Sequence, residues 1–259
     1  MSVREVPARR VATESRPRLA ARLAWVGPFA REFGVVTGIV FAYFLLRGLA
    51  PDRPDFAIEV AKQVIAIEQA LGLYHEAAIQ EASIHWGWMR ETANFIYAYA
   101  HFPALIVVAV WLWFTRRGSY RELRNTLFVS MVAGLVFYYV LPTAPPRLLE
   151  FHGVESSFVD TIFGGGTRVE YAQPGIILNE YAAIPSFHFG WMIVASAALW
   201  TGSRHPALRM AALVLSVLMS WAIVATGNHF FADMILGGVV VVASWLLARR
   251  WAGHRLLRW

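Results

Sequence analysis

Six apolar segments of this sequence are suited to cross a bilayer as helices, each of which needs about 20 mostly apolar residues. The predicted spans lie at residues 33–49, 93–115, 126–141, 187–200, 206–226 and 230–248. With 58% hydrophobic and only 15% charged residues, the chain has more apolar side chains than a soluble domain can bury. We therefore predict an all-α integral membrane protein, built as a six-transmembrane-helix bundle.

Basic residues are distributed unevenly between the two sides of these spans. Of the 23 Lys and Arg residues, 17 fall in the N-terminal segment, the second-to-third and fourth-to-fifth connections, and the C-terminal tail. They are Arg4, Arg9, Arg10, Arg16, Arg18, Arg22, Arg31, Arg116, Arg117, Arg121, Arg124, Arg204, Arg209, Arg249, Arg250, Arg255 and Arg258. Because cytoplasmic loops are enriched in Lys and Arg, both termini are predicted to be cytoplasmic.

This orientation sets the expected organisation of a multi-pass protein in the cell (plasma) membrane. A basic cytoplasmic arm at 1–32 precedes a six-span membrane domain at 33–250, and a basic cytoplasmic tail follows at 251–259. The formal net charge of +6 is explained by the orientation, so no nucleic-acid partner is expected.

An amphipathic helix is predicted on the outer side, between the first two spans. Phe56, Val60, Val64, Ile67 and Leu71 recur at intervals of three and four residues, with polar side chains between them. This spacing places the apolar side chains on one face of a helix. Such a helix is expected to lie along the membrane interface.

Three polar clusters end three of the spans on the outer side. His229 and Asp233 are four residues apart, about one helical turn, so they share a face at the start of the last span. Residues 184–188 open the span at 187–200, and residues 142–147 follow the span at 126–141. Ionisable groups at membrane depth are costly and are usually functional. We expect these clusters to form one extracytoplasmic site.

The residue types in these clusters suit phosphoryl transfer, which needs a nucleophile, a proton donor and cations around the phosphoryl oxygens. His229, His188 and Arg147 can supply one of each, while Asp233 can fix the tautomer of its histidine. Ser186 lies at a helix start, where its hydroxyl and free amides can seat a phosphate. Taken singly, a histidine can be a structural hydrogen-bonding residue, Ser186 an N-cap and Arg147 an interfacial anchor. Their joint arrangement favours a site.

Two further polar residues leave alternatives open. Asn228 can donate to a phosphate or cap the last span. His101, in the outer half of the second span, can contact the site as an accessory residue or bond to a neighbouring helix.

The clusters resemble the signatures of a known family. IPSFH at 184–188 and NHFFAD at 228–233 are similar to the second and third signatures of the type 2 phosphatidic acid phosphatase (PAP2) superfamily. PTAPPR at 142–147 resembles the branch that includes inositol phosphorylceramide synthase, an inositolphosphotransferase branch. The resemblance covers about 141–238 and implies a PAP2-like catalytic membrane domain.

The resemblance implies a role for each matching residue. His229 is expected to be the nucleophile on phosphorus, Asp233 to orient it, and His188 to protonate the leaving oxygen. The family also has Lys and Arg in its first signature and an Arg six residues before the nucleophile, where this chain has Ile223. Phosphate binding is then expected to fall to Arg147 and to Arg168, together with Ser186 and Asn228.

The predicted function is that of a membrane lipid phosphatase or phosphotransferase that uses no cofactor. Its substrate is expected to be a membrane lipid carrying a phosphate group, and water or an alcohol accepts the group. A metal-dependent phosphohydrolase is one alternative, because two His and one Asp can form a ligand triad, although metal sites for phosphate usually hold more carboxylates. No metal ligand is predicted. A lipid-phosphate transporter without catalysis is the other alternative, but the repeated halves typical of transporters are not visible. The sequence does not indicate the oligomeric state.

Overall fold

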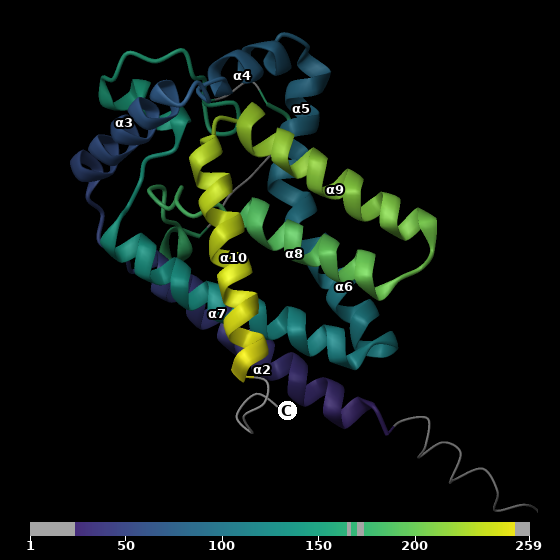
Figure 1. Ribbon diagram of the computed structural model, residues 1–259. Coiled ribbons are helices and arrows are strands. Elements are labelled where there is room, and N and C mark those ends of the chain that lie inside the picture. Colours follow the sequence, from purple (N-terminus) through teal and green to yellow (C-terminus); the bar gives the residue numbers. More distant parts are fainter. Residues whose placement is uncertain (1–23, 165–166, 170–173, 252–259) are drawn as a thin grey trace, which may run out of the picture. The chain divides into compact units, whose positions relative to one another are not determined.

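The computed structural model describes residues 24–164, 167–169 and 174–251, and it divides the chain into two compact units, residues 1–42 and 43–259 (Figure 1). α2 (Val26–Gly48) begins in the first unit and ends in the second. All elements described below belong to the second unit. Most of the predicted basic arm and tail lies outside the described residues, so this division of the chain stays a prediction.

Five helices of the described chain are long and apolar enough to cross a membrane, which confirms an all-helical multi-pass fold. Besides α2, they are the continuous run of α5 (Gly87–Phe95), η1 (Ile96–Ala100) and α6 (His101–Thr115), then α7 (Arg117–Val140), α9 (Pro206–Ala225) and α10 (Phe231–Trp251). The predicted count of six spans is not confirmed.

The predicted span at 187–200 is α8 (Phe187–Gly202), a helix of only 16 residues. At 1.5 Å per residue it is about 24 Å long, which is less than the hydrocarbon core of about 30 Å. α8 packs against α6, α7, α9 and α10, so it is a central helix of the bundle. Ser186, the residue before it, is fully buried, and α8 therefore begins inside the protein rather than at its surface.

The predicted amphipathic helix is α3 (Pro54–Ala70), and it is followed by the short α4 (Glu76–Ile84). Its apolar side chains divide between two environments. Val60 and Val64 are buried, whereas Ile67 and Leu71 are 57% and 66% exposed. The small Ala57, like Val64, belongs to the apolar cluster around Phe230. α3 thus packs on the protein with one face and presents other apolar side chains outward, as an interfacial helix does.

The connection between α7 and α8 folds back over the start of α10. It contains three short turns of 3-10 helix, η2 (Pro146–Leu148), η3 (Glu150–His152) and η4 (Gly175–Ile177), and an isolated bridge between Thr143 and Ala182. The Phe158 ring packs edge-on against the Phe230 ring, with centroids 6.3 Å apart. This packing holds the connection over the start of α10.

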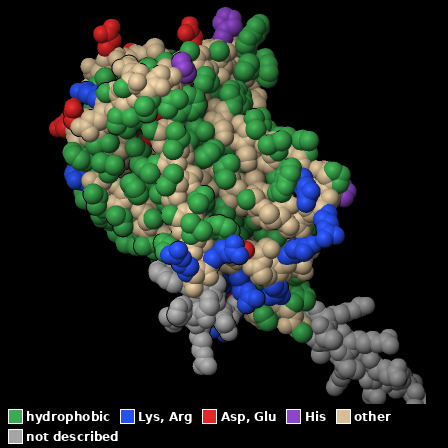
Figure 2. Space-filling view, viewed as in Figure 1, with side chains coloured by type: hydrophobic (Ala, Val, Ile, Leu, Met, Phe, Trp, Pro, Cys, Tyr) green, Lys and Arg blue, Asp and Glu red, His purple; other side chains and the backbone are tan. Residues whose placement is uncertain are grey.

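Basic side chains collect at the opposite end of the second unit, as Figure 2 shows. Arg117 begins α7, Arg204 lies between α8 and α9, and Arg249 lies near the end of α10. Arg249 is 3.6 Å from Glu122 of α7, so these two helix ends are adjacent. The charge asymmetry that the sequence predicts is therefore present along the axis of this unit.

Candidate active site

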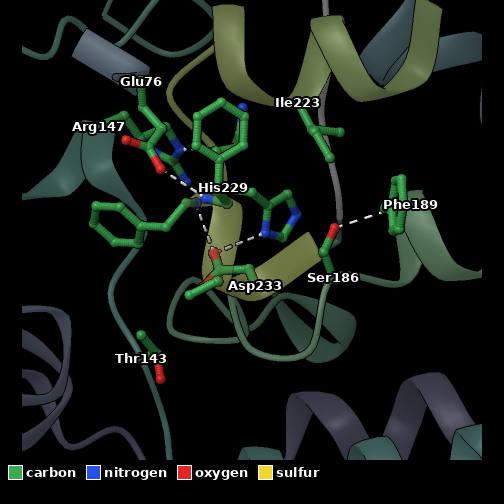
Figure 3. A network of polar contacts seen from close by, with 12 residues as sticks. Glu76, Thr143, Arg147, Ser186, Phe189, Ile223, His229 and Asp233 are labelled. Carbon is green, nitrogen blue, oxygen red and sulfur yellow. Dashed lines mark hydrogen bonds and ion pairs between the residues drawn. The ribbon is translucent and has the colours of Figure 1, made fainter. Parts of the chain in front are cut away.

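His229 and Asp233 form the centre of the site, at the turn between α9 and α10 (Figure 3). His229 Nδ1 lies 3.2 Å from Asp233 Oδ2, and the Asp233 side chain is fully buried. The turn depends on Gly227, whose φ of 67° suits glycine best. When Nδ1 donates its proton to Asp233, Nε2 is the free nitrogen, and His229 lines a cavity.

His188 approaches His229 from the start of α8. The two ring centroids are 6.0 Å apart, and both rings line the same cavity. Ser186 is the N-cap of α8, with its Oγ accepting from Phe189 N at 3.5 Å, and its own N donates to the Asp233 carbonyl at 3.0 Å. The start of α8 is therefore fastened directly to the first turn of α10.

Gly237 allows this close contact between α8 and α10. A Cβ atom at Gly237 would lie 2.2 Å from the carbonyl oxygen of Ser186, far inside van der Waals contact. Any larger residue at this position would push the two helix starts apart.

Arg147 also lines the cavity, and several contacts hold it in place. Its backbone N donates to the Gly227 carbonyl at 2.8 Å, and its Nε donates to Asn228 Oδ1 at 3.0 Å. Its Nη1 forms an ion pair with Asp160 at 2.9 Å, and the guanidinium lies 4.7 Å from the centroid of the Phe163 ring. The side chain is 7% exposed. None of these contacts uses Nη2, which leaves that nitrogen for a substrate.

Asn228 lies between Arg147 and Thr226. Its Oδ1 accepts from Arg147 Nε, and its Nδ2 donates to Thr226 Oγ1 at 2.9 Å. It lines the cavity, so it stays a candidate phosphate contact, and its side-chain hydrogen bonds orient Arg147 rather than cap α10.

His101 lies against His188 rather than apart from the site. Its ring centroid is 4.8 Å from that of His188, and the Tyr97 ring stacks on His188 at 4.4 Å. Tyr97 lies in the π-helical η1 and His101 follows it directly, and single π turns are frequent at functional sites. His101 is 3% exposed and its Nδ1 has no hydrogen-bond partner within the described chain. Its accessory role stays a prediction.

Neither Arg168, which was predicted to bind phosphate, nor position 223, where the family has an Arg, contributes a charge to the cavity. Arg168 is exposed, its backbone N donates to Glu91 Oε2 at 2.9 Å, and it does not line the cavity. Ile223 is fully buried in an apolar cluster, and its carbonyl accepts from the backbone N of His229 at 3.2 Å. Position 223 therefore supports the backbone of the turn, and the cations that line the cavity are Arg147 and Arg47.

The sequence does not predict that four further residues lie at the site. Asp160 and Phe163 hold Arg147 from 13 and 16 residues away, within a long connection of irregular structure. Glu76 and Glu68 contact the first turn of α10 from α4 and α3. Only tertiary contacts bring these residues together.

The cavity itself has a volume of about 100 Å³. This is enough room for a phosphoryl group. Ser186 and Asp233 lie behind its walls rather than in them. Within the described residues, no three His, Asp or Glu side chains are grouped so that they could hold a metal ion.

Comparison with known proteins places this site in a family. The chain is 25% identical over 175 residues to the phosphoinositol dihydroceramide synthase of Bacteroides thetaiotaomicron, a match that covers 62% of this chain and 56% of that relative. No solved structure matches. The sequence profile of the PAP2 superfamily matches residues 62–247, a range that contains the histidines, Asp233 and Arg147. The chain therefore belongs to the PAP2 superfamily.

Proposed function

We propose that the protein is an integral membrane enzyme that transfers a phosphoryl or phosphoalcohol group from a membrane lipid by way of a phosphohistidine at His229. One observation carries the proposal: His188 faces the His229–Asp233 pair across a small cavity that Arg147 also lines. Membership of the PAP2 superfamily, and a relative named as a lipid synthase, support a membrane lipid phosphatase or phosphotransferase.

The first step forms the bond between His229 Nε2 and phosphorus. The bond from phosphorus to the leaving oxygen breaks, and His188 gives its proton to that oxygen. Asp233 accepts from Nδ1 and stabilises the positive charge that develops on the ring. Arg147 Nη2, Asn228 and the first amides of α8 bind the equatorial oxygens. Ser186 acts by capping α8 rather than by touching the phosphate.

The second step reverses the roles of the histidines. An acceptor hydroxyl gives its proton to His188 and attacks the phosphorus, and the bond to Nε2 breaks. Water as the acceptor makes the enzyme a phosphatase, and an alcohol makes it a transferase. The name of the relative favours an alcohol, with a phosphoinositol group transferred to a sphingoid-type lipid as one candidate pair.

Turnover of a panel of lipid phosphates and phosphodiesters by the purified protein in oxygen-18 water tests this proposal. Label in released phosphate identifies a phosphatase, and an unlabelled phosphodiester identifies a transferase. A phosphoryl adduct that is labile to acid and stable to base is expected on His229 with a slow substrate. Absence of any product overturns the enzyme proposal, and activity that a chelator abolishes supports the metal-dependent alternative.

A further inference from the structure

Three carboxyl groups converge on the first turn of α10. The backbone amides of residues 230, 231 and 232 each donate to a different side chain: Asp233 Oδ2 at 2.9 Å, Glu76 Oε1 at 2.7 Å and Glu68 Oε1 at 2.7 Å. Asp233 belongs to the same turn, whereas Glu76 begins α4 and Glu68 lies near the end of α3. Figure 3 shows Glu76 beside the turn that carries His229 and Asp233.

All three carboxyl groups are buried. Glu68 is 1% exposed, and Glu76 and Asp233 are fully buried. One oxygen of each has no hydrogen-bond partner among the described residues. Burying carboxyl groups is costly, and a single Ser or Thr would suffice as an ordinary cap. The partial positive charge of the helix start offsets part of this cost. The arrangement therefore does more than cap the start of a helix.

Glu68 differs from an ordinary glutamate in its protonation. Burial, and less strongly the nearby Glu76 and Asp233, raise the pKa of Glu68 to about 8, while the amide of Ala232 opposes the shift. Glu68 therefore keeps its proton at pH 7 and can donate it to Glu76. Tyr74, next to α4, also faces this pair of glutamates.

The position of His229 makes these contacts important. His229 lies in the turn just before α10, and its ring contacts Asp233. Asp233 is the third residue of α10 and belongs to the same first turn that the two glutamates bind. A small rotation of this turn would move Asp233 away from Nδ1 and turn Nε2 away from the phosphorus. Misplacement of reacting groups by about 1 Å can cost on the order of a hundredfold in rate.

We propose that Glu68 and Glu76 are positioning residues for catalysis, which hold the first turn of α10 so that His229 stays aligned with its substrate. The proposal rests on the proposed function. It has a second consequence: the protein's own carboxyl groups occupy the α10 amides, so the phosphate is bound at the α8 start and Arg147 instead.

Four variants of the full-length protein in detergent test the proposal. Glu76→Ala and Glu68→Ala leave a buried amide unpaired, and each should lower kcat by about tenfold or more with KM changed less than about threefold. Glu76→Gln and Glu68→Gln keep an acceptor oxygen and should stay within about threefold of wild-type kcat at pH 7. Glu59→Gln and Glu81→Gln, exposed on the same two helices, are the matched controls and should be unchanged.

The pH profile gives a second readout that does not require the alanine variants to fold. Wild-type kcat should fall as pH rises through about 8, when Glu68 ionises beside Glu76 and Asp233. Glu68→Gln cannot ionise, so this fall should disappear. An unchanged fall in Glu68→Gln, or wild-type kcat in folded Glu76→Ala and Glu68→Ala, overturns the proposal. A wild-type protein without turnover overturns the proposed function instead.

Discussion

The starts of α8 and α10 lie against each other at the site, yet they are built differently. α8 has one neutral cap, the hydroxyl of Ser186, and its first two residues, Phe187 and His188, line the cavity. The first turn of α10 is closed by three carboxyl groups. A helix start binds anions through its free amides. In the proposed mechanism, the start of α8 is therefore open to a substrate anion and the start of α10 is not.

The largest expected effect comes from removing the histidine at either helix start. His229→Ala and His188→Ala should each lower turnover by at least about a hundredfold, because one removes the nucleophile and the other the proton donor. Thermal melting in detergent should show both variants folded. Near wild-type turnover in either variant would show that the two helix starts do not form the reactive centre.

Forcing the two helix starts apart should have the next largest effect. Gly237→Ala places a Cβ atom 2.2 Å from the Ser186 carbonyl oxygen, which should cost about 1–3 kcal/mol of stability and lower kcat by about tenfold. Gly238→Ala is the matched control, since its Cβ would be 3.4 Å from the nearest atom, the Phe189 ring. Equal kcat in the two variants would show that the contact is not needed for alignment.

Removing the cap of α8 should have a smaller effect. Ser186→Ala should cost about 1 kcal/mol of stability and lower kcat only a few-fold, because Oγ holds one amide and does not line the cavity. Kinetics in parallel with thermal melting measure both quantities. A loss as large as that of His188→Ala would mean that Ser186 touches the substrate.

The closed start of α10 should make stability depend on pH. Between the ordinary pKa of 4.5 and about 8, the unfolded chain releases the Glu68 proton and the folded chain keeps it, so stability falls as pH rises through this window. Glu68→Gln should remove this part of the fall and melt higher than the wild type at pH 8. Melting curves at pH 5 and pH 8 measure it. Parallel curves for the two proteins would contradict the assignment.

Orientation in the membrane can be measured without changing activity. We expect both helix starts to face the extracytoplasmic side, because Arg117, Arg204 and Arg249 lie at the opposite end. A membrane-impermeant thiol reagent should label Ser156→Cys in intact cells and miss Ser119→Cys. The reverse labelling would place the site, and its lipid substrate, on the cytoplasmic side.

Local patterns were enough for much of the fold and for the reactive pair. Apolar segments predicted the helical membrane fold, and the four-residue spacing of His229 and Asp233 predicted their contact. The same patterns could not show that α8 is short and central, because an apolar side chain looks alike whether it meets lipid or another helix. For the same reason, the side of α3 that packs on the protein could not be told from the side that faces outward.

Residue type and helical spacing are local properties, so the candidate reactive residues could be predicted from the sequence. How these residues are held depends on contacts between helices that are far apart in the chain. Arg147, unlike Arg168, lines the cavity, where Asp160 and Phe163 contact it. Glu68 and Glu76 reach α10 from helices more than 150 residues earlier in the chain. Contacts over such separations depend on how the helices pack, and packing leaves no periodic signal in the sequence.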